Sequence, residues 1–173
     1  WNMIFKKFKI IPRLVVFDLD HTLWPFGVDN FFYKPPYRRE NNKIFDSENK
    51  EMNYFDKVPS VLESIRKQKI DMAVASRTEY PDGAFSLLKL FKLDDYFKYK
   101  QIYPGTKTVH FEKFKNESRY QYNEMLFFDD EQRNIDDTSP LGVTAILVDP
   151  EKGVTLNDLT EGLEKFAKNR QLN

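Results

Sequence analysis

The sequence predicts an α/β fold with a doubly wound parallel sheet. Three patterns indicate it: short apolar runs, amphipathic helical repeats between them, and polar residues directly after the runs. Alternating strands and helices form such a sheet, and its ligands bind beyond the carboxyl ends of the strands. The 173 residues suffice for a sizeable core, so we expect a single domain over residues 1–173.

Four apolar runs are the expected strands. They cover residues 14–17, 72–75, 125–128 and 143–148. Nearly continuous apolar runs of this length are typical of strands that are buried on both faces of a parallel sheet. We therefore expect helices to cover this sheet.

Helical patterns lie between and after the runs. Apolar residues repeat at helical spacing over residues 58–65 and again over residues 84–91, so each segment has one apolar stripe. Thr155 and Asp158 have the spacing of a capping box and precede a further apolar stripe, which predicts a terminal helix.

Residues 25–57 break the alternation. Gly27, Pro35 and Pro36 interrupt any period, and the segment is too long for an ordinary connection. We interpret it as a small insertion near the functional site.

The composition excludes several classes of protein. Lys and Arg together number 27, and Asp and Glu together also number 27. No net charge therefore draws the protein to nucleic acid or to an anionic membrane. The absence of cysteine excludes disulfides, zinc–thiolate sites and a cysteine nucleophile. No apolar run approaches the length of a membrane span. We expect a cytoplasmic or nuclear monomer that binds neither nucleic acid nor membrane.

Polar side chains follow the predicted strands. Asp18 and Asp20 come directly after the first run, and side chains at positions i and i+2 of an extended chain point the same way, about 6.6 Å apart. Ser76 follows the second run and residues 129–130 follow the third. Each is an ordinary turn former when taken alone, but in a parallel sheet all of them converge at one edge.

Lys107 adds a cation to this set. Gly105 and Thr106 predict that a helix begins there, which places Lys107 in the first turn, where the helix dipole disfavours it by about 0.3 to 1 kcal/mol. Clustered carboxylates without His or Cys suit Mg²⁺, and a neighbouring Ser and Lys point to phosphate. Unit charges 4 Å apart interact by about 4 kcal/mol at an effective dielectric of 20, so bare carboxylates would repel phosphate strongly. Mg²⁺ and Lys107 would turn this repulsion into attraction.

These motifs resemble a known superfamily. Residues 18–22 resemble motif I of the haloacid dehalogenase (HAD) superfamily, Ser76 motif II, Lys107 motif III and residues 129–130 motif IV. The strings DLDHTLWPF and FFDDEQRN are similar to those of magnesium-dependent phosphatases in that superfamily, and the resemblance spans residues 14–167. It implies a HAD-like Rossmannoid fold with a minimal cap insertion, and a Mg²⁺-dependent phosphomonoester hydrolase that forms an aspartyl-phosphate.

The resemblance implies catalytic and metal-binding roles. Asp18 is the expected nucleophile, and Asp20 the expected general acid and base. Asp18, Asp130 and the backbone carbonyl of Asp20 are the expected Mg²⁺ ligands. Asp129 takes the place of a glycine of the family motif and is expected to support the site, and Asn134 is expected to fix the loop that carries Asp130.

The resemblance also implies contacts to the substrate. Ser76, Lys107 and the N–H of Leu19 are expected to hold phosphate, and Arg77 is expected to line the substrate side.

Three residues bear on the substrate class. Some members carry a bulky aromatic residue in the pocket where this chain has Gly27, but Trp24 and Phe26 are present and are expected as walls of the substrate site. The small insertion predicts an open site, which favours a phosphotyrosine on a protein surface, stacked near Trp24 or Phe26. The resemblance also allows a small sugar phosphate.

Two other classes stay open. A receiver-like phosphoacceptor domain also uses acids, a hydroxyl and a lysine, but there the lysine comes last, whereas Lys107 precedes residues 129–130. A non-catalytic binding domain would not need the complete residue set that this chain has. We expect His21, on the strand face opposite Asp20, and His110, on the Lys107 helix, to pack or to hydrogen-bond.

Overall fold

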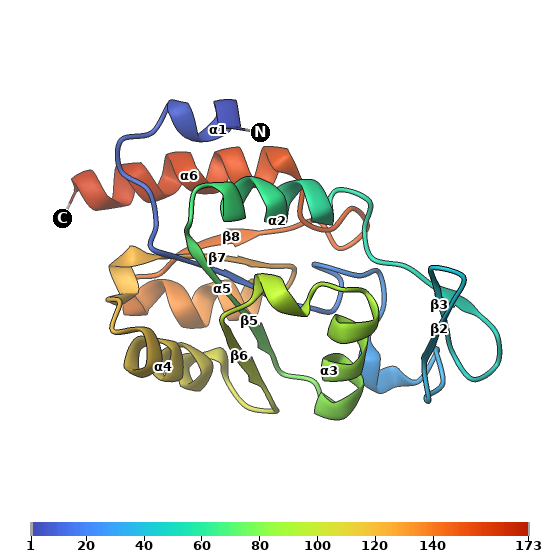
Figure 1. Ribbon diagram of the computed structural model, residues 1–173. Helices are drawn as coiled ribbons and strands as arrows, with labels where there is room; N and C mark the ends of the chain where they lie inside the picture. Colours follow the sequence, from blue (N-terminus) through green and yellow to red (C-terminus); the bar gives the residue numbers. More distant parts are fainter. Residues whose placement is uncertain (1, 173) are drawn as a thin grey trace.

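A five-stranded parallel sheet forms the centre of the computed structural model, which describes residues 2–172 (Figure 1). The strands are β1 (Leu14–Phe17), β5 (Asp71–Ser76), β6 (Tyr99–Ile102), β7 (Met125–Asp129) and β8 (Thr144–Leu147). Their order is β6-β5-β1-β7-β8, and all neighbours are parallel. The predicted α/β sheet is confirmed, and β1 lies in its middle.

The predicted strands form because both of their faces are buried. Every residue of β1 and β7 is buried, and Val16 of β1 pairs with Ala73 on one side and with Phe127 on the other. The strand β6 was not predicted from the sequence. It lies at the edge of the sheet, where three of its four residues are only half-buried, so it has no continuous apolar run.

Helices cover both faces of the sheet (Figure 1). On one face lie α2 (Val58–Lys67), α3 (Pro81–Leu90) and α6 (Leu156–Gln171), and on the other α4 (Lys107–Ser118) and α5 (Gln132–Thr138). Side chains alternate along the strands, so Phe17 joins the core on the first face and Val16 joins the core on the second.

The helix signals of the sequence are confirmed. The stripes at residues 58–65 and 84–91 lie in or directly beside α2 and α3. Before α6, the Thr155 hydroxyl accepts a hydrogen bond from the Asp158 N–H, and the Asp158 carboxylate accepts one from the Thr155 N–H. The helix α4 begins with Lys107, directly after Thr106.

The remaining helices are short. They are α1 (Asn2–Lys6) and the 3-10 turns η1 (Val28–Asn30), η2 (Asp94–Tyr96), η3 (Tyr122–Glu124) and η4 (Ser139–Leu141). Within residues 2–172, no helix combines the length and the apolar character that crossing a membrane requires.

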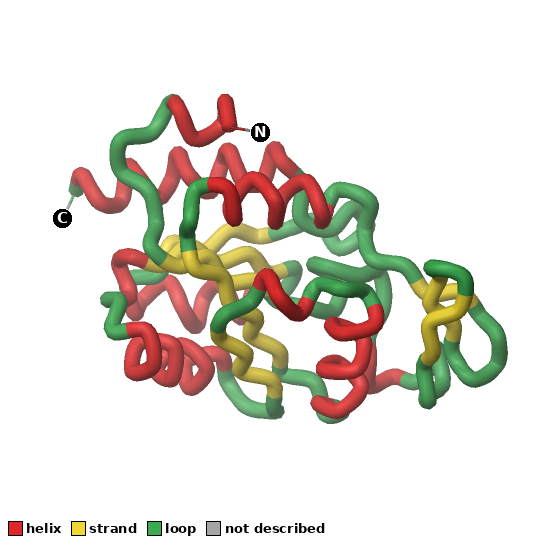
Figure 2. Tube along the Cα trace, in the orientation of Figure 1, coloured by secondary structure: helices red, strands yellow, loops and turns green. Residues whose placement is uncertain are grey.

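The insertion contains a small antiparallel sheet beside the main one (Figure 2). Its strands are β2 (Arg38–Glu40), β3 (Lys43–Phe45) and β4 (Glu51–Met52). The buried Asp46 carboxylate accepts hydrogen bonds from the backbone N–H groups of Lys34, Glu48 and Lys50, which closes the loop between β3 and β4. The segment is therefore ordered by local polar contacts and not by a large core of its own.

Candidate active site

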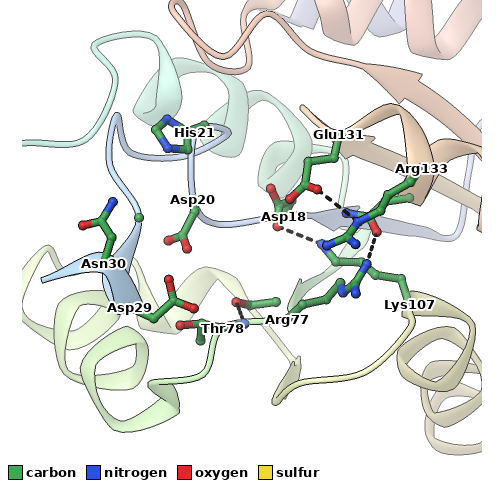
Figure 3. A pocket seen from close by; sticks show the side chains of 13 residues that line it. Asp18, Asp20, His21, Asp29, Asn30, Arg77, Thr78, Lys107, Glu131 and Arg133 are labelled. Atoms are coloured by element: carbon green, nitrogen blue, oxygen red, sulfur yellow. Dashed lines mark hydrogen bonds and ion pairs between the residues drawn. The ribbon is translucent and has the colours of Figure 1, made fainter.

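A polar cavity of about 280 Å³ opens at the carboxyl edge of the sheet (Figure 3). The end of β1, the segment after β5, the start of α4, the segment after β7 and the turn η1 all contribute to it. Its lining consists of Asp18, Asp20, His21, Gly27, Asp29, Asn30, Ser76, Arg77, Thr78, Lys107, Glu131, Arg133 and Asn134. The sheet therefore brings together the predicted polar strand ends.

A buried lysine joins two of the carboxylates. The Lys107 ammonium donates to Asp18 Oδ1 at 2.7 Å, to Asp129 Oδ2 at 2.8 Å and to the Ala75 carbonyl at 2.7 Å. Its side chain is 1% exposed, so all three of its donors are used inside the protein. Burial alone would lower the pKa of Lys107, but the Asp18 and Asp129 carboxylates raise it above its ordinary value.

Three carboxylates meet beside this lysine. Oxygens of Asp18, Asp129 and Asp130 lie within 4.8 Å of one another. The Asp130 carboxyl group lies close enough to Asp18 to help raise the pKa of Asp18. Burial raises the pKa of Asp18 to about 7 and that of Asp129 to about 6, although Lys107 opposes both shifts.

This donor set fits Mg²⁺. The ligands are hard carboxylate oxygens, and neither Cys nor His belongs to the cluster. Asp129 already accepts from Lys107, from the Asn134 amide at 2.9 Å and from the Glu131 N–H at 2.9 Å. Asp18 accepts from Lys107 through one oxygen and from Thr22 through the other, and Asp18 with Asp130 stays the predicted ligand pair.

Asp20 lies in the same cavity with one side of its carboxyl group occupied. Its Oδ1 accepts from the Trp24 indole N–H at 2.9 Å and from the Val28 N–H at 3.3 Å. Burial raises the pKa of Asp20 to about 7, and the negative charges of Asp18 and Asp29 add to this while the two hydrogen bonds oppose it. Its carboxyl group points into the cavity (Figure 3).

Trp24 and Phe26 do not line the cavity, in contrast to the wall that we expected from the sequence. The Trp24 side chain is 0% exposed and Phe26 is 5% exposed, and their rings stack at 5.6 Å. Both rings belong to the core on the first face of the sheet. The indole N–H reaches Asp20, so Trp24 contacts the general-acid candidate and not the open side of the site.

The phosphate candidates Ser76 and Arg77 lie at the end of β5 and directly after it. The Ser76 hydroxyl oxygen accepts from the Thr78 N–H at 3.2 Å, which leaves its proton available to a ligand. Arg77 donates through Nη1 to the Asn134 side-chain oxygen Oδ1 at 3.1 Å, while its buried Nε finds no acceptor among residues 2–172. Asn134 thus bridges Arg77 and Asp129. Through Asp129, it contacts the loop that carries Asp130.

Leu19 lies at the turn between the two candidate catalytic acids, Asp18 and Asp20. Its side chain is buried, and its carbonyl accepts from the N–H groups of Thr22 and Leu23. These bonds turn the chain directly after Asp18, which is where the sequence places the N–H expected to meet phosphate.

The two histidines have different positions. His21 lines the cavity and does not lie on the opposite strand face, because the chain turns there with φ of 60° and the extended alternation ends. His110 is buried on α4 as expected, and Nε2 lies 2.8 Å from the Ser76 carbonyl and 2.9 Å from that of Tyr103. Burial lowers the pKa of His110, so a neutral ring is favoured.

Besides His21, five lining residues had no predicted role in the site. Glu131 and Arg133 lie in the FFDDEQRN string and form an ion pair at 3.2 Å, and Thr78 directly follows Arg77, so proximity to a motif could have indicated these three. Asp29 and Asn30 come from the insertion, which has no period that could have indicated them.

The chain matches known proteins along most of its length. Residues 10–169 match the family model described as Acid Phosphatase. The chain is 42% identical over 158 residues to magnesium-dependent phosphatase 1 of Homo sapiens, a match that covers 91% of this chain and 89% of that protein. It is 38% identical over 144 residues to a HAD-like hydrolase superfamily protein of Schizosaccharomyces pombe, covering 77% of this chain and 83% of that one.

Solved structures share its fold. One is the N-terminal part of protein BF1531 from Bacteroides fragilis, which contains a phosphatase domain complexed with Mg; the TM-score is 0.64 at 16% identity, over 94% of this chain and 43% of that one. Another is a HAD-superfamily hydrolase from Ehrlichia chaffeensis, with a TM-score of 0.64 at 13% identity over 90% and 98% of the two chains. At such low identity these matches indicate the fold alone.

Proposed function

The chain belongs to the acid phosphatase family of the HAD superfamily and is a magnesium-dependent phosphatase, and on this premise we propose that it hydrolyses phosphomonoesters through an aspartyl-phosphate on Asp18. The position of Asp18 carries the proposal. This carboxylate lies at the end of the central strand, contacts Lys107 directly and is within reach of Asp130 for a shared cation. Asp20 follows two residues later and faces the same cavity.

Asp18 acts as the nucleophile. Its carboxylate oxygen attacks phosphorus while the phosphorus–oxygen ester bond breaks, which leaves an aspartyl-phosphate and a departing alcohol. Lys107 donates to one Asp18 oxygen at 2.7 Å and Thr22 to the other at 3.1 Å, so the carboxylate is held in place before substrate arrives. When bound by Asp18, Asp130 and the Asp20 carbonyl, Mg²⁺ supplies positive charge that offsets the carboxylates and the phosphoryl oxygens.

Asp20 moves the protons. It gives a proton to the leaving oxygen and then takes one from the water that attacks the aspartyl-phosphate, which releases inorganic phosphate and restores Asp18. A pKa of about 7 leaves a large fraction of Asp20 protonated at neutral pH, as the first of these steps requires.

Ser76, Arg77 and Lys107 hold the phosphoryl group in this proposal, together with the N–H of Leu19. The hydroxyl proton of Ser76 is available, and Lys107 already lies against the nucleophile. Hydrogen bonds from fixed cationic and neutral donors stabilise the charge that develops on the phosphoryl oxygens.

The lining favours a polar phosphomonoester, such as a sugar phosphate, as substrate. Every side chain that lines the cavity is polar or charged, apart from the glycine at position 27, and the cavity volume of about 280 Å³ suits a small leaving group. Hydroxyl groups of a sugar can pair with such side chains, whereas an aromatic ring would leave them unpaired.

A phosphotyrosine on a protein is the second candidate. Its support from the sequence depended on stacking with Trp24 or Phe26, which are buried. Its remaining support is a pair of exposed rings beside η1, Phe31 at 46% and Phe32 at 59% exposed, which could contact a protein substrate outside the cavity. The monomeric state and the cytosolic or nuclear location stay predictions from the sequence.

The proposal predicts hydrolysis of p-nitrophenyl phosphate that requires Mg²⁺ and Asp18. In steady-state assays, Asp18→Asn abolishes turnover and Asp20→Asn slows it by about 10² to 10⁴, because the first change removes the nucleophile and the second the general acid. EDTA removes the activity of the wild-type enzyme and added Mg²⁺ restores it. Full activity of Asp18→Asn would contradict the proposal.

The same assay separates the rival classes. Mass spectrometry of acid-quenched enzyme locates the phosphoryl group on Asp18 during turnover; a long-lived phosphoprotein without phosphate release would indicate a phosphoacceptor domain. Neither Mg²⁺ dependence nor hydrolysis is expected of a binding domain. A panel of sugar phosphates and phosphotyrosine peptides, compared by kcat/KM, decides between the two substrate classes.

A further inference from the structure

The turn η1 forms a side of the cavity that the phosphoryl-transfer steps do not use. Asp29 and Asn30 lie in this turn, and Gly27 directly precedes it. The Asp29 carboxyl group lies across from that of Asp20, whereas Lys107 and Arg133 lie at the far side (Figure 3). These residues therefore lie next to the oxygen that leaves with the alcohol.

Asn30 presents a fixed hydrogen-bond donor. Its Oδ1 accepts from the Phe32 N–H at 3.0 Å, which identifies the oxygen and turns the NH₂ group away from the backbone. Within the part of the chain that the structure describes, no acceptor pairs with this NH₂ group.

Asp29 presents an acceptor beside it. Its Oδ2 accepts from the Glu79 N–H at 2.9 Å, which ties η1 to the segment before α3. No donor among residues 2–172 reaches its other oxygen. A donor and an acceptor, each held by a backbone contact, therefore occupy neighbouring positions.

Gly27 keeps the space between these groups and Asp20 open. A Cβ atom at this position would lie 3.0 Å from Asn30 Nδ2 and 3.9 Å from Asp20 Oδ2. Since Asp20 Oδ1 is occupied by Trp24 and Val28, Oδ2 is the oxygen free to exchange a proton with the leaving group. The leaving group then lies within reach of both Asp20 and the Asn30 amide.

We propose that Asn30 and Asp29 form a leaving-group subsite that recognises a hydroxyl group on the carbon next to the phosphorylated one. The Asn30 amide donates to the hydroxyl oxygen, and the Asp29 carboxylate accepts the hydroxyl proton, so one hydroxyl pairs with both. The subsite rests on the proposed phosphomonoester hydrolysis and narrows its substrate to the phosphate esters of polyols and sugars. An alkyl or aryl leaving group leaves both side chains unpaired.

A matched pair of substrates tests the subsite. Glycerol 3-phosphate carries the adjacent hydroxyl, whereas 3-hydroxypropyl phosphate lacks only this group and keeps the same carbon chain and the terminal hydroxyl. For the wild-type enzyme we expect kcat/KM to be at least about tenfold higher for glycerol 3-phosphate, because the site has a donor and an acceptor that 3-hydroxypropyl phosphate leaves unpaired. Asn30→Ala and Asp29→Ala bring this ratio close to one.

Two further variants sharpen the test. Gly27→Ala places a methyl group against the Asn30 amide and lowers the ratio of the two kcat/KM values. The control is Asn116→Ala, which changes an exposed asparagine on α4 and keeps the wild-type ratio. Both substrates are measured on one preparation, so a loss of folded protein cancels in the ratio.

The outcomes separate the subsite from the proposed function. Equal kcat/KM for the two alkyl phosphates in an enzyme that hydrolyses p-nitrophenyl phosphate would overturn the subsite and leave the phosphatase proposal standing. A preference that survives in both Asn30→Ala and Asp29→Ala would also overturn it. No hydrolysis of any of the three esters with Mg²⁺ present would refute the proposed function, and the subsite with it.

Discussion

Lys107 occupies the helix position that least favours a cation, the first residue of α4. The helix dipole costs it about 0.3 to 1 kcal/mol there. Asp18 and Asp129 lie at 2.7 and 2.8 Å from its ammonium group. Even at 4 Å and an effective dielectric of 20, each attraction is worth about 4 kcal/mol, so the two carboxylates outweigh the dipole and offset much of the cost of burial. The unfavourable position is therefore maintained by the site itself.

As the proposed general acid, Asp20 is expected to set the alkaline limit of activity. Its pKa of about 7 means that the protonated form, which the first step needs, is present below this pH and is lost as the pH rises through it. We expect kcat/KM for glycerol 3-phosphate to fall above about pH 7. Trp24→Phe removes a hydrogen bond that stabilises the ionised form of Asp20, so the pKa of Asp20 rises. The alkaline limb of the pH–activity profile then moves up by about one pH unit.

The control for this pH profile is Phe26→Leu. Phe26 stacks on the Trp24 ring but makes no contact with Asp20 that would change its pKa, so this variant loses packing and keeps the wild-type limb. An alkaline limb that stays in place, or moves down, in Trp24→Phe would contradict the role of the indole.

The sequence predicts residues on strands better than residues on turns. Asp18, Asp20 and Asp130 follow apolar runs whose shared edge is dictated by a parallel sheet, and the structure brings them together. The place of His21 depends on one backbone angle, a φ of 60°, which no pattern of hydrophobicity encodes. The same holds for Asn30, which lies in a 3-10 turn of the insertion.

At the scale of elements, His110 joins the end of β5 to the start of α4. Its ring stacks on Tyr103 at 4.3 Å, and its nitrogens lie within 3.1 Å of the carbonyls of Ser76, Tyr103 and Thr106. One side chain thus connects the segment that carries Ser76 to the loop that leads into Lys107. Both phosphate-binding candidates depend on this contact for their relative position.

His110→Ala is therefore expected to weaken phosphate binding. We expect KM for p-nitrophenyl phosphate to rise about tenfold, with a smaller change in kcat, because loosened positioning of Ser76 and Lys107 removes about 1.4 kcal/mol of binding. His110→Gln, which keeps a donor for the carbonyls, recovers part of the loss. Steady-state kinetics measure both effects.

Phe114→Leu provides the matched control for His110. Phe114 is buried on the same helix and packs edge-on against Phe111, away from the cavity lining. It should lower stability without raising KM. Equal KM values in His110→Ala and the wild-type enzyme would show that His110 only fills space.

Strands that the sequence did not predict are those without two buried faces. The residues of β6 are half-buried at the sheet edge, apart from Ile102, and those of β2 are mostly exposed. Hydrophobic patterns report burial, so they identify β1 and β7 and miss edges and small antiparallel hairpins. The capping box of α6 was predictable because its signal is local.

At the scale of the whole molecule, Mg²⁺ binding is coupled to folding. The carboxylates of Asp18 and Asp130 come together only in the folded sheet, so we expect the ion to bind the native state preferentially. At a Mg²⁺ concentration one hundred times its Kd, the free energy of unfolding rises by about 2.7 kcal/mol. Denaturant unfolding with Mg²⁺ and with EDTA measures this difference.

The Asp130→Asn variant should lose most of the Mg²⁺-dependent stabilisation. The control is Glu151→Gln, which changes an exposed acid outside the cavity and should keep the stabilisation. The same stabilisation in Asp130→Asn and in the wild-type protein would show that the ion acts elsewhere on the molecule.

The central place of β1 has a consequence for fluctuations of the native state. This strand has hydrogen-bonded neighbours on both sides, so fraying of either sheet edge leaves its own ladder closed. Its backbone amides will exchange with deuterated solvent more slowly than those of β6 or β8. The proposed nucleophile, Asp18, is thus attached to the segment that opens last, and transient opening of the periphery does not displace it.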